Sequence, residues 1–276
     1  MEIRTRVTEA AHAIKGRLQG ELDLAILVCF GTDTLAEMLQ GALVLPYDQL
    51  PGMPTGAAAP GELALGTVHG RQVLLLEGGP DLYKGRTLAE ACIPVWVLSQ
   101  LGLRWLVLIN AALGIAEDHA PGDLFVVEDH IDFMGESPLR GHAHEELGPA
   151  YPDMSSVYDQ RLRQMALEVG MSIGIPVHTG VLAARPGPAN ETPAELRFLR
   201  GIGVDAVATS LVPEAVAARH AGLATLGLSA LVDTNPAPHR TPVALEGMIE
   251  GAEMAADRLQ RFLRELIRRL GKELGR

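Results

Sequence analysis

The sequence predicts an α/β fold with a largely parallel or mixed sheet that helices cover on both faces. Short runs rich in leucine and β-branched residues alternate with segments of helical periodicity, which is typical of this class. The 276 residues suffice for one large domain or two small ones, and no repeat or linker divides them. Hydrophobic residues make up 47% of the chain and charged residues 21%, a balance that indicates a folded protein.

The expected elements follow from these patterns in chain order. We expect strands near 24–29, 72–76, 104–109, 124–127, 178–183, 205–209 and 224–230. We expect helices near 34–40, 86–101, 158–170, 193–201 and 213–221, with a further helical pattern from Thr241 on. The stretch GMPTGAAAPG at 52–61 is interpreted as a functional loop, with a plain connection as an equal alternative.

Composition and charge exclude several classes of function. The formal net charge of −11 argues against binding to nucleic acid or to an anionic membrane, because both need a basic surface. Cys29 and Cys92 lie in apolar runs, where buried free thiols are commoner than a disulfide, and this favours a reducing compartment. The first 18 residues are amphipathic and have no signal-peptide pattern. We therefore expect a cytoplasmic protein that acts on a small molecule.

In the stretch LVLINAALGI, residues 106–115, a run of branched apolar residues ends in Asn110, Ala111 and Ala112. Ligands of open α/β sheets gather at the carboxyl ends of strands, where backbone N–H groups become available. Small side chains there permit either a ligand passing over the backbone or tight packing of a helix on the sheet. Both interpretations remain open at this point.

Three further stretches carry polar residues at the ends of expected strands. Thr192 and Glu195 form a capping-box pattern that leaves Glu191 free to accept hydrogen bonds from a ligand, unless it is an exposed acidic residue at a helix start. Ser210 is placed to cap a helix or to contact a ligand, and capping is the commoner role. Asp233 is a turn former or a hydrogen-bond acceptor.

Several familiar catalytic patterns are missing from the sequence. His142 and His144 are two residues apart and His119 and His130 stand alone, so no metal-ligand spacing is found and we expect no metal. The sequence also lacks GxSxG, GxxxxGK[ST] and GxGxxG. Hydrolase-elbow, P-loop and simple dinucleotide-binding interpretations therefore have no support.

Taken together, these stretches resemble the trimeric purine nucleoside phosphorylase family, which includes the methylthioadenosine phosphorylases. NAALGI resembles the family's NAAGG, PGDLFVVEDHIDFMGESPLRG its GD-strand-DHIN segment, and YPDMSSVYD its FPAMSDAYD. GPANET resembles GPSFET, and DAVATSLVPEAVAARHAGL resembles DAVGMSTVPEVIVARHCGL. The similarity runs from about residue 20 to 265 in the same order and spacing.

The resemblance implies one domain over residues 1–276, with a central mixed β-sheet flanked by helices, and a homotrimer. It implies a pentosyltransferase of purine salvage, which reversibly converts a purine nucleoside and inorganic phosphate into free base and pentose 1-phosphate. Phosphate is then the co-substrate, and no other cofactor is expected. The partners are a purine nucleoside or base.

The resemblance also assigns residues to the base and the sugar. Glu191 and Asp233 match the two catalytic residues that bind the base, and an aspartate favours 6-aminopurines such as adenine because it accepts from the exocyclic amine. Asn190 replaces a stacking phenylalanine, Thr209 a methionine, and Leu245 the histidine near the 5′-hydroxyl. The full set of implied substrate-binding residues is Tyr83, Asn110, Ala111, Ala112, Asn190, Thr209 and Leu245.

The implied phosphate site differs from that of the family. The GSGLG loop reads CFGTDTL, and glycine and aspartate replace an arginine and a histidine at Gly79 and Asp81. The candidate phosphate ligands are Gly31, Thr32, Ala111, Ser210, Lys84 and Arg86. Two alternatives therefore stay open: a non-catalytic purine-binding or scaffold homologue, and a phosphate-independent hydrolase with Asp81 or Asp33 as general base.

Overall fold

Nine strands pair into one sheet in the part of the chain that the computed structural model describes, residues 2–18, 22–29, 35–55, 61–78, 82, 85–140, 146–235 and 245–273. The strands are β1 (Leu24–Val28), β2 (Gln40–Pro46), β3 (Glu62–Val68), β4 (Arg71–Glu77), β5 (Trp105–Gly114), β6 (Leu124–Asp132), β7 (Val177–Ala184), β8 (Ala206–Ala208) and β9 (Ala224–Thr234). The helices are α1 (Ile3–Lys15), α2 (Leu88–Ala91), α3 (Ile93–Gln100), α4 (Gln160–Ile173), α5 (Pro193–Gly201), α6 (Val212–His220) and α7 (Leu245–Glu273), with short 3₁₀ turns at Leu35–Met38 and Tyr47–Gln49.

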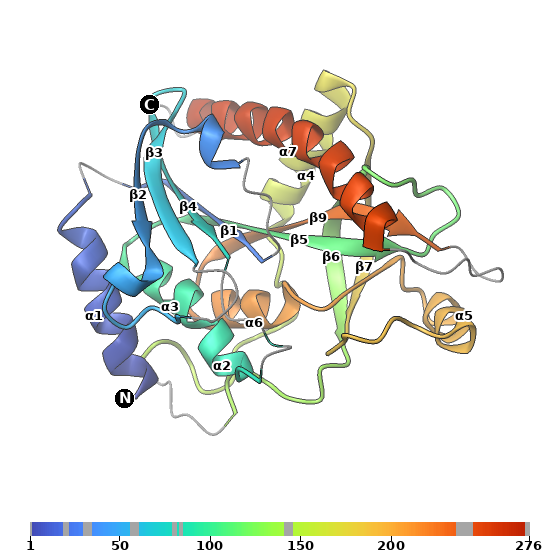
Figure 1. Cartoon of the computed structure of the whole chain (residues 1–276), viewed down its shortest axis with the longest axis horizontal. Helices are drawn as coiled ribbons and strands as arrows, with labels where there is room; N and C mark the ends of the chain where they lie inside the picture. Colours follow the sequence, from blue (N-terminus) through green and yellow to red (C-terminus); the bar gives the residue numbers. More distant parts are fainter. Residues whose placement is uncertain are drawn as a thin grey trace.

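The sheet is mixed and partly closes on itself. Its order is β2-β3-β4-β1-β5-β8-β7-β6-β9, and an additional pairing of β5 with β9 joins the last five strands into a small barrel. Strands β4, β1, β5 and β9 run parallel to one another, whereas β8, β7 and β6 run the opposite way. The long central strand β5 therefore belongs both to the barrel and to the open half of the sheet (Figure 1).

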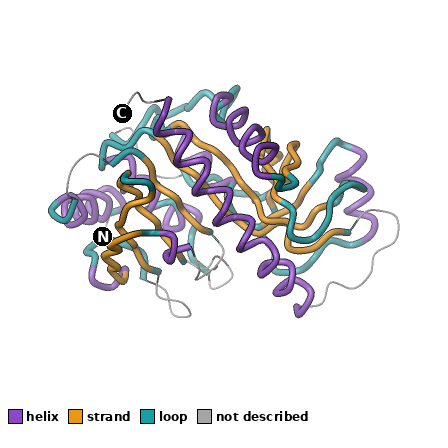
Figure 2. Tube along the Cα trace, turned by 90° about the horizontal axis from the view of Figure 1, so that it is seen from above, coloured by secondary structure: helices purple, strands orange, loops and turns teal. Residues whose placement is uncertain are grey.

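Helices cover both faces of the sheet. Figure 1 shows α4 and α7 on one side and α1, α3 and α6 on the other, and Figure 2 shows α7 running across the strands. Strand β1 illustrates the packing, because Leu24, Ile26 and Val28 join the core under α4 and α7 while Ala25 and Leu27 join the core under α1, α3 and α6. Side chains of a strand alternate between faces, so a strand covered on both sides reads as a continuous apolar run. The predicted α/β fold is confirmed.

Most expected elements occur near their predicted positions, and the exceptions have physical reasons. Strands β2 and β3 were not among the expected strands, and β2 lies at the edge of the sheet, where it exposes Leu43 and Val44. The predicted helix at 34–40 is only a 3₁₀ turn followed by β2. The single helix expected at 86–101 is divided at Cys92 into α2 and α3, with a proline in the first turn of α3. No described helix is long and apolar enough to cross a membrane.

Helix α7 lies so close to β9 that one position between them admits no side chain. A Cβ atom on Gly251 would lie 1.8 Å from the carbonyl oxygen of Val232, which belongs to the backbone of β9. The neighbouring strand residue is Asp233, one of the candidate site residues. Packing of α7 therefore determines where the end of β9 lies.

We predict that Gly251→Ala lowers the free energy of unfolding by about 1–3 kcal/mol, because the added methyl group must push α7 away from β9. The control is Gly247→Ala on the same helix, where an added Cβ meets nothing within 4 Å. That control is expected to raise stability by up to about 1 kcal/mol, because alanine favours helices. Urea unfolding of both variants measures the difference, and equal stabilities would contradict the close packing.

Candidate active site

The candidate site lies where β5 changes partners along one edge. Through Ile109 this edge pairs in parallel with β1, and from Leu113 it pairs antiparallel with β8. Between these two points, residues 110–112 face no strand on this edge among the described residues, while the opposite edge stays paired with β9. Backbone groups at such a switch point are available to a ligand. The three residues singled out in the sequence thus lie at a gap in the sheet.

The small side chains next to this gap also pack in the core, as the packing interpretation predicts. Ala111 packs against a cluster formed by Ala230, Val232 and Ala255, the last of which belongs to α7. Ala112 is buried in the core on the opposite face. Small side chains at 110–112 therefore serve helix packing and leave the strand edge open at the same place.

At this gap, the side chain of Asn110 connects β5 to the segment that follows β8. Its side chain is 1% exposed, and its Nδ2 donates to the carbonyl oxygen of Ser210 at 3.1 Å. Its Oδ1 is buried without a hydrogen-bond partner among the described residues, and so is the Oγ of Ser229, the residue directly opposite on β9. Buried polar atoms are rarely left unpaired, so two of them side by side indicate a place where a ligand or water binds.

The turn after Ser210 is strained. Leu211 has φ +83° and ψ −45°, an unusual conformation for a residue other than glycine, and it is the N-cap of α6. Its N–H donates to the buried carboxyl of Glu214 at 2.8 Å, and burial raises the pKa of that carboxyl. The expectation that Ser210 caps α6 is therefore wrong, because Leu211 takes that position and Glu214 accepts its N–H.

Glu191 lies in a buried ion pair. Its carboxylate is 7% exposed and contacts Nη1 of Arg185 at 3.3 Å, while Nη2 of the same arginine contacts Glu195 at 3.0 Å. The backbone N–H of Arg185 donates to the carbonyl of Ala208, which links this group to the end of β8. The capping box of Thr192 and Glu195 is confirmed. Glu191 lies outside that capping box, as expected, and pairs with Arg185 instead. The alternative of an exposed acid is wrong, because Glu191 is buried.

Asp233 lies at the other side of the site, at the end of β9. A register shift between Ala112 and Leu113 places Asp233 opposite Leu113, so that Val232 is the extra residue of a bulge. The carboxylate is half-buried and accepts from the N–H of Thr234 at 2.7 Å. Bulges often redirect side chains next to active sites, and this one lies in the strand segment that borders the gap.

The structure describes some of the remaining candidate residues, and others lie outside the described residues. Asn190 is exposed and Thr209 is half-buried after β8. Gly31, Thr32, Tyr83 and Lys84, as well as the side chain of Leu245, lie outside the described residues, as do residues 56–60 of the loop expected at 52–61.

Arg86 has other partners in this structure. Its Nη1 contacts Glu90 at 3.4 Å and its Nη2 donates to the carbonyl of Thr55. These contacts attach the segment before α2 to the loop that follows Leu50.

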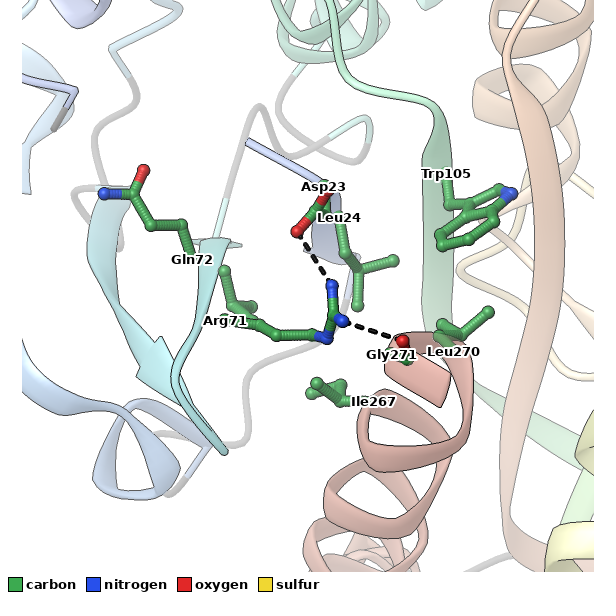
Figure 3. Close-up of a pocket in the computed structure, with 9 residues that line it drawn as sticks. Asp23, Leu24, Arg71, Gln72, Trp105, Ile267, Leu270 and Gly271 are labelled. Carbon is green, nitrogen blue, oxygen red and sulfur yellow. Dashed lines mark hydrogen bonds and ion pairs between the residues drawn. The ribbon is translucent and has the colours of Figure 1, made fainter. Parts of the chain in front are cut away.

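A small cavity lies away from the candidate site. It is lined at the starts of β1, β4 and β5 and at the end of α7, as Figure 3 shows. Arg71 spans it, donating to Asp23 at 3.2 Å and to the carbonyl of Gly271 at 2.8 Å. Its lining atoms otherwise belong mainly to the hydrophobic core, so we regard it as a packing defect at the opposite ends of the strands.

Two features of the structure were missed by sequence reasoning. Arg185 belongs to no recognised motif, and only its contact with Glu191 reveals its role. The donor atoms of Asp118, His119 and His178 lie within 4.8 Å of one another, a grouping suited to a metal ion. The search for short motifs could not find it, because His178 is 59 residues away from His119 along the chain.

Comparisons with known proteins agree with this fold. The family model of the phosphorylase superfamily matches residues 23–268. The chain is 36% identical over 271 residues to purine nucleoside phosphorylase 1 of Geobacillus stearothermophilus, a match that covers 98% of this chain and 99% of that protein.

Solved structures give the same result. Isoform 2 of purine nucleoside phosphorylase from Schistosoma mansoni, in complex with cytosine and ribose-1-phosphate, aligns with a TM-score of 0.91 at 32% identity and covers 97% of both chains. A Schistosoma mansoni purine nucleoside phosphorylase in complex with adenosine aligns with a TM-score of 0.90 at 29% identity, covering 97% of this chain and 98% of that one. The chain therefore belongs to the purine nucleoside phosphorylase family of the phosphorylase superfamily.

Proposed function

We propose that the protein catalyses the reversible phosphorolysis of purine nucleosides to free base and pentose 1-phosphate. The observation that carries this proposal is the gap in the edge of β5, where a buried oxygen of Asn110 has no hydrogen-bond partner among the described residues, next to Ser210. Family membership supplies the reaction, and the gap supplies an opening in this chain for nucleoside and phosphate. Inorganic phosphate is the co-substrate, and the reaction needs no other cofactor.

Phosphorolysis makes three chemical demands on the site. The glycosidic bond breaks toward an oxocarbenium-like pentose, the departing purine needs its negative charge stabilised, and phosphate must lie beside the anomeric carbon. We assign the base to Glu191 and Asp233. Arg185 holds the carboxylate of Glu191 in place, and a fixed acceptor costs no reorganisation when the purine leaves.

The other assignments follow the family resemblance. The proposed substrate-lining residues are Tyr83, Asn110, Ala111, Ala112, Asn190, Thr209 and Leu245, and the proposed phosphate ligands are Gly31, Thr32, Ala111, Ser210, Lys84 and Arg86. A 6-aminopurine is the preferred base, because the carboxylate of Asp233 accepts from an exocyclic amine. The adenosine complex of the Schistosoma mansoni protein supports a site of this fold that admits such a base.

The proposal includes an assembly, a cellular location and a single domain over residues 1–276. The homotrimer follows from the family resemblance and is measured by light scattering of the purified protein. The cytoplasm is favoured by Cys29 and Cys92, which are not joined in a disulfide.

The proposal predicts that the pure protein releases base from adenosine or methylthioadenosine only when inorganic phosphate is present. Free base and pentose 1-phosphate are then formed in equal amounts, since phosphate is the acceptor of the pentose. Chromatography of both products, with inosine and guanosine alongside and with and without phosphate, measures this. The 6-aminopurine nucleosides are expected to react faster than the 6-oxopurine nucleosides.

Each other outcome of this assay contradicts the proposal in a different way. Release of base at the same rate without phosphate would identify a hydrolase. Binding of purine without release of base from any of the four nucleosides would identify a non-catalytic homologue. Faster cleavage of inosine and guanosine would leave the reaction intact but overturn the role assigned to Asp233.

A second prediction concerns Arg185 as a positioning residue. We expect Arg185→Met to lower kcat/KM for the preferred nucleoside about 10–100-fold, because hydrogen bonds to a charged group contribute about 1.5–3 kcal/mol. Arg185→Lys is expected to recover part of this loss, because one ammonium group can still contact Glu191. The matched control is Glu195→Gln, which keeps the capping box and the contact between Arg185 and Glu191.

The control separates positioning from stability. Glu195→Gln is expected to stay within about twofold of the unmodified protein in kcat/KM, since capping by glutamine is equivalent. The thermal midpoints of all three variants are measured in parallel. If Arg185→Met changes kcat/KM no more than Glu195→Gln does, Arg185 has no role in positioning the catalytic carboxylate.

A further inference from the structure

A second group of polar side chains lies between the end of β5 and the start of β7. Asp118 and His119 are in the connection from β5 to β6, and His178 is the second residue of β7. The donor atoms of these three side chains lie within 4.8 Å of one another. We propose that Asp118, His119 and His178 bind a divalent transition-metal ion, and that Zn²⁺ is the ion that suits them best.

The orientation of His178 is the first argument for this site. Its Nε2 lies 2.9 Å from Oδ2 of Asp123, so Nε2 carries the proton and donates to that carboxylate. The other nitrogen, Nδ1, then presents its lone pair 3.7 Å from Oδ2 of Asp118. A histidine that donates one nitrogen to a carboxylate and offers the other to a metal is the usual arrangement of a metal ligand.

The carboxylate behind His178 is itself held firmly. Asp123 is 6% exposed, its Oδ2 accepts from the N–H of Ala120 at 3.2 Å, and its Oδ1 contacts Nη1 of Arg258 at 2.9 Å. Arg258 belongs to α7, so this support connects the loop, β7 and the long helix. A buried and fully paired carboxylate fixes the ring of His178 in one direction.

His119 completes the donor set. Its ring centroid lies 4.5 Å from that of His178, and its Nδ1 is buried with no hydrogen-bond partner among the described residues. Gly114 makes room for this ring, because a Cβ atom there would lie 2.9 Å from Nδ1 and 3.0 Å from the Cβ of His119. Two imidazole rings at this separation carry no mutual hydrogen bond, whereas a shared metal ion would be attractive to both.

The donor types indicate the kind of ion. Two imidazoles and one carboxylate suit Zn²⁺, with water as a fourth ligand and metal–donor distances of about 2.0–2.2 Å. Tetrahedral ligands at such distances are about 3.4 Å apart, so the donors must move closer by roughly 1 Å. The side chain of Asp118 is 78% exposed and is free to make this movement. Binding would tie the loop before β6 to β7.

The experiment uses protein freed of metal by a chelator. Zn²⁺ is titrated in competition with a chromophoric chelator, and Co²⁺ is added separately, because tetrahedral Co²⁺ has intense visible absorption bands. We expect one tightly bound ion per chain, a tetrahedral Co²⁺ spectrum, and a higher thermal midpoint with Zn²⁺. Asp118→Asn and His119→Gln are expected to weaken Zn²⁺ binding about tenfold or more and to remove the gain in thermal midpoint.

Two controls separate this site from others on the chain. Glu117→Gln makes the same change of charge at the exposed neighbour of Asp118 and is expected to leave Zn²⁺ affinity unchanged. The double variant His142→Ala/His144→Ala removes two closely spaced histidines and should also keep the tight site. The proposal is overturned if no ion binds tightly, if Glu117→Gln weakens binding as much as Asp118→Asn, or if only the double variant loses the ion.

Discussion

The hydrogen bond from Asn110 to the carbonyl of Ser210 connects β5 to the turn before α6 at the place where the candidate site lies. On one side of it β5 is a strand of an open parallel sheet, and on the other side it is a strand of a closed barrel. In the part of the chain that the structure describes, the change of partner leaves residues 110–112 without a paired strand along one edge. The strained backbone of Leu211 and the buried carboxyl of Glu214 lie directly after this bond, so the turn into α6 is fixed by it.

Buried charge is the second constraint on this molecule. An isolated carboxylate in the interior would be strongly destabilising, so each one needs a cation or several donors. Arg185 forms an ion pair with Glu191. Asp123 forms an ion pair with Arg258 and accepts a hydrogen bond from the N–H of Ala120. Arg185 and Glu191 lie in the loop after β7, whereas Asp123 directly precedes β6 and Arg258 belongs to α7. Each pair fixes the direction of a side chain to which we assign a role in ligand binding. Removing Arg185 alone would leave the buried carboxylate of Glu191 without the cation that pairs with it.

The sequence predicted the fold class and most helices and strands because apolar periodicity records burial directly. It failed at β2 and β3, and Leu43 and Val44 of β2 are exposed on an edge strand. It left two roles open for Ser210, and the N-cap position is taken by Leu211. The carboxylate of Glu191 was identified through the family resemblance, but its arginine partner was not. Contacts such as those of Arg185 with Glu191 and of His119 with His178 depend on how loops fold back, which no local pattern records.

The central claim is that nucleoside and phosphate occupy the gap in the edge of β5. Residue-resolved amide hydrogen exchange tests it most directly, comparing the free protein with protein saturated by adenine and inorganic phosphate, a pair that binds without reacting. We expect slower exchange at the amides of residues 110–112 and in the turn from Ser210 to Leu211, because ligand closes the open edge. Unchanged exchange at these amides in protein shown to be saturated would contradict the account.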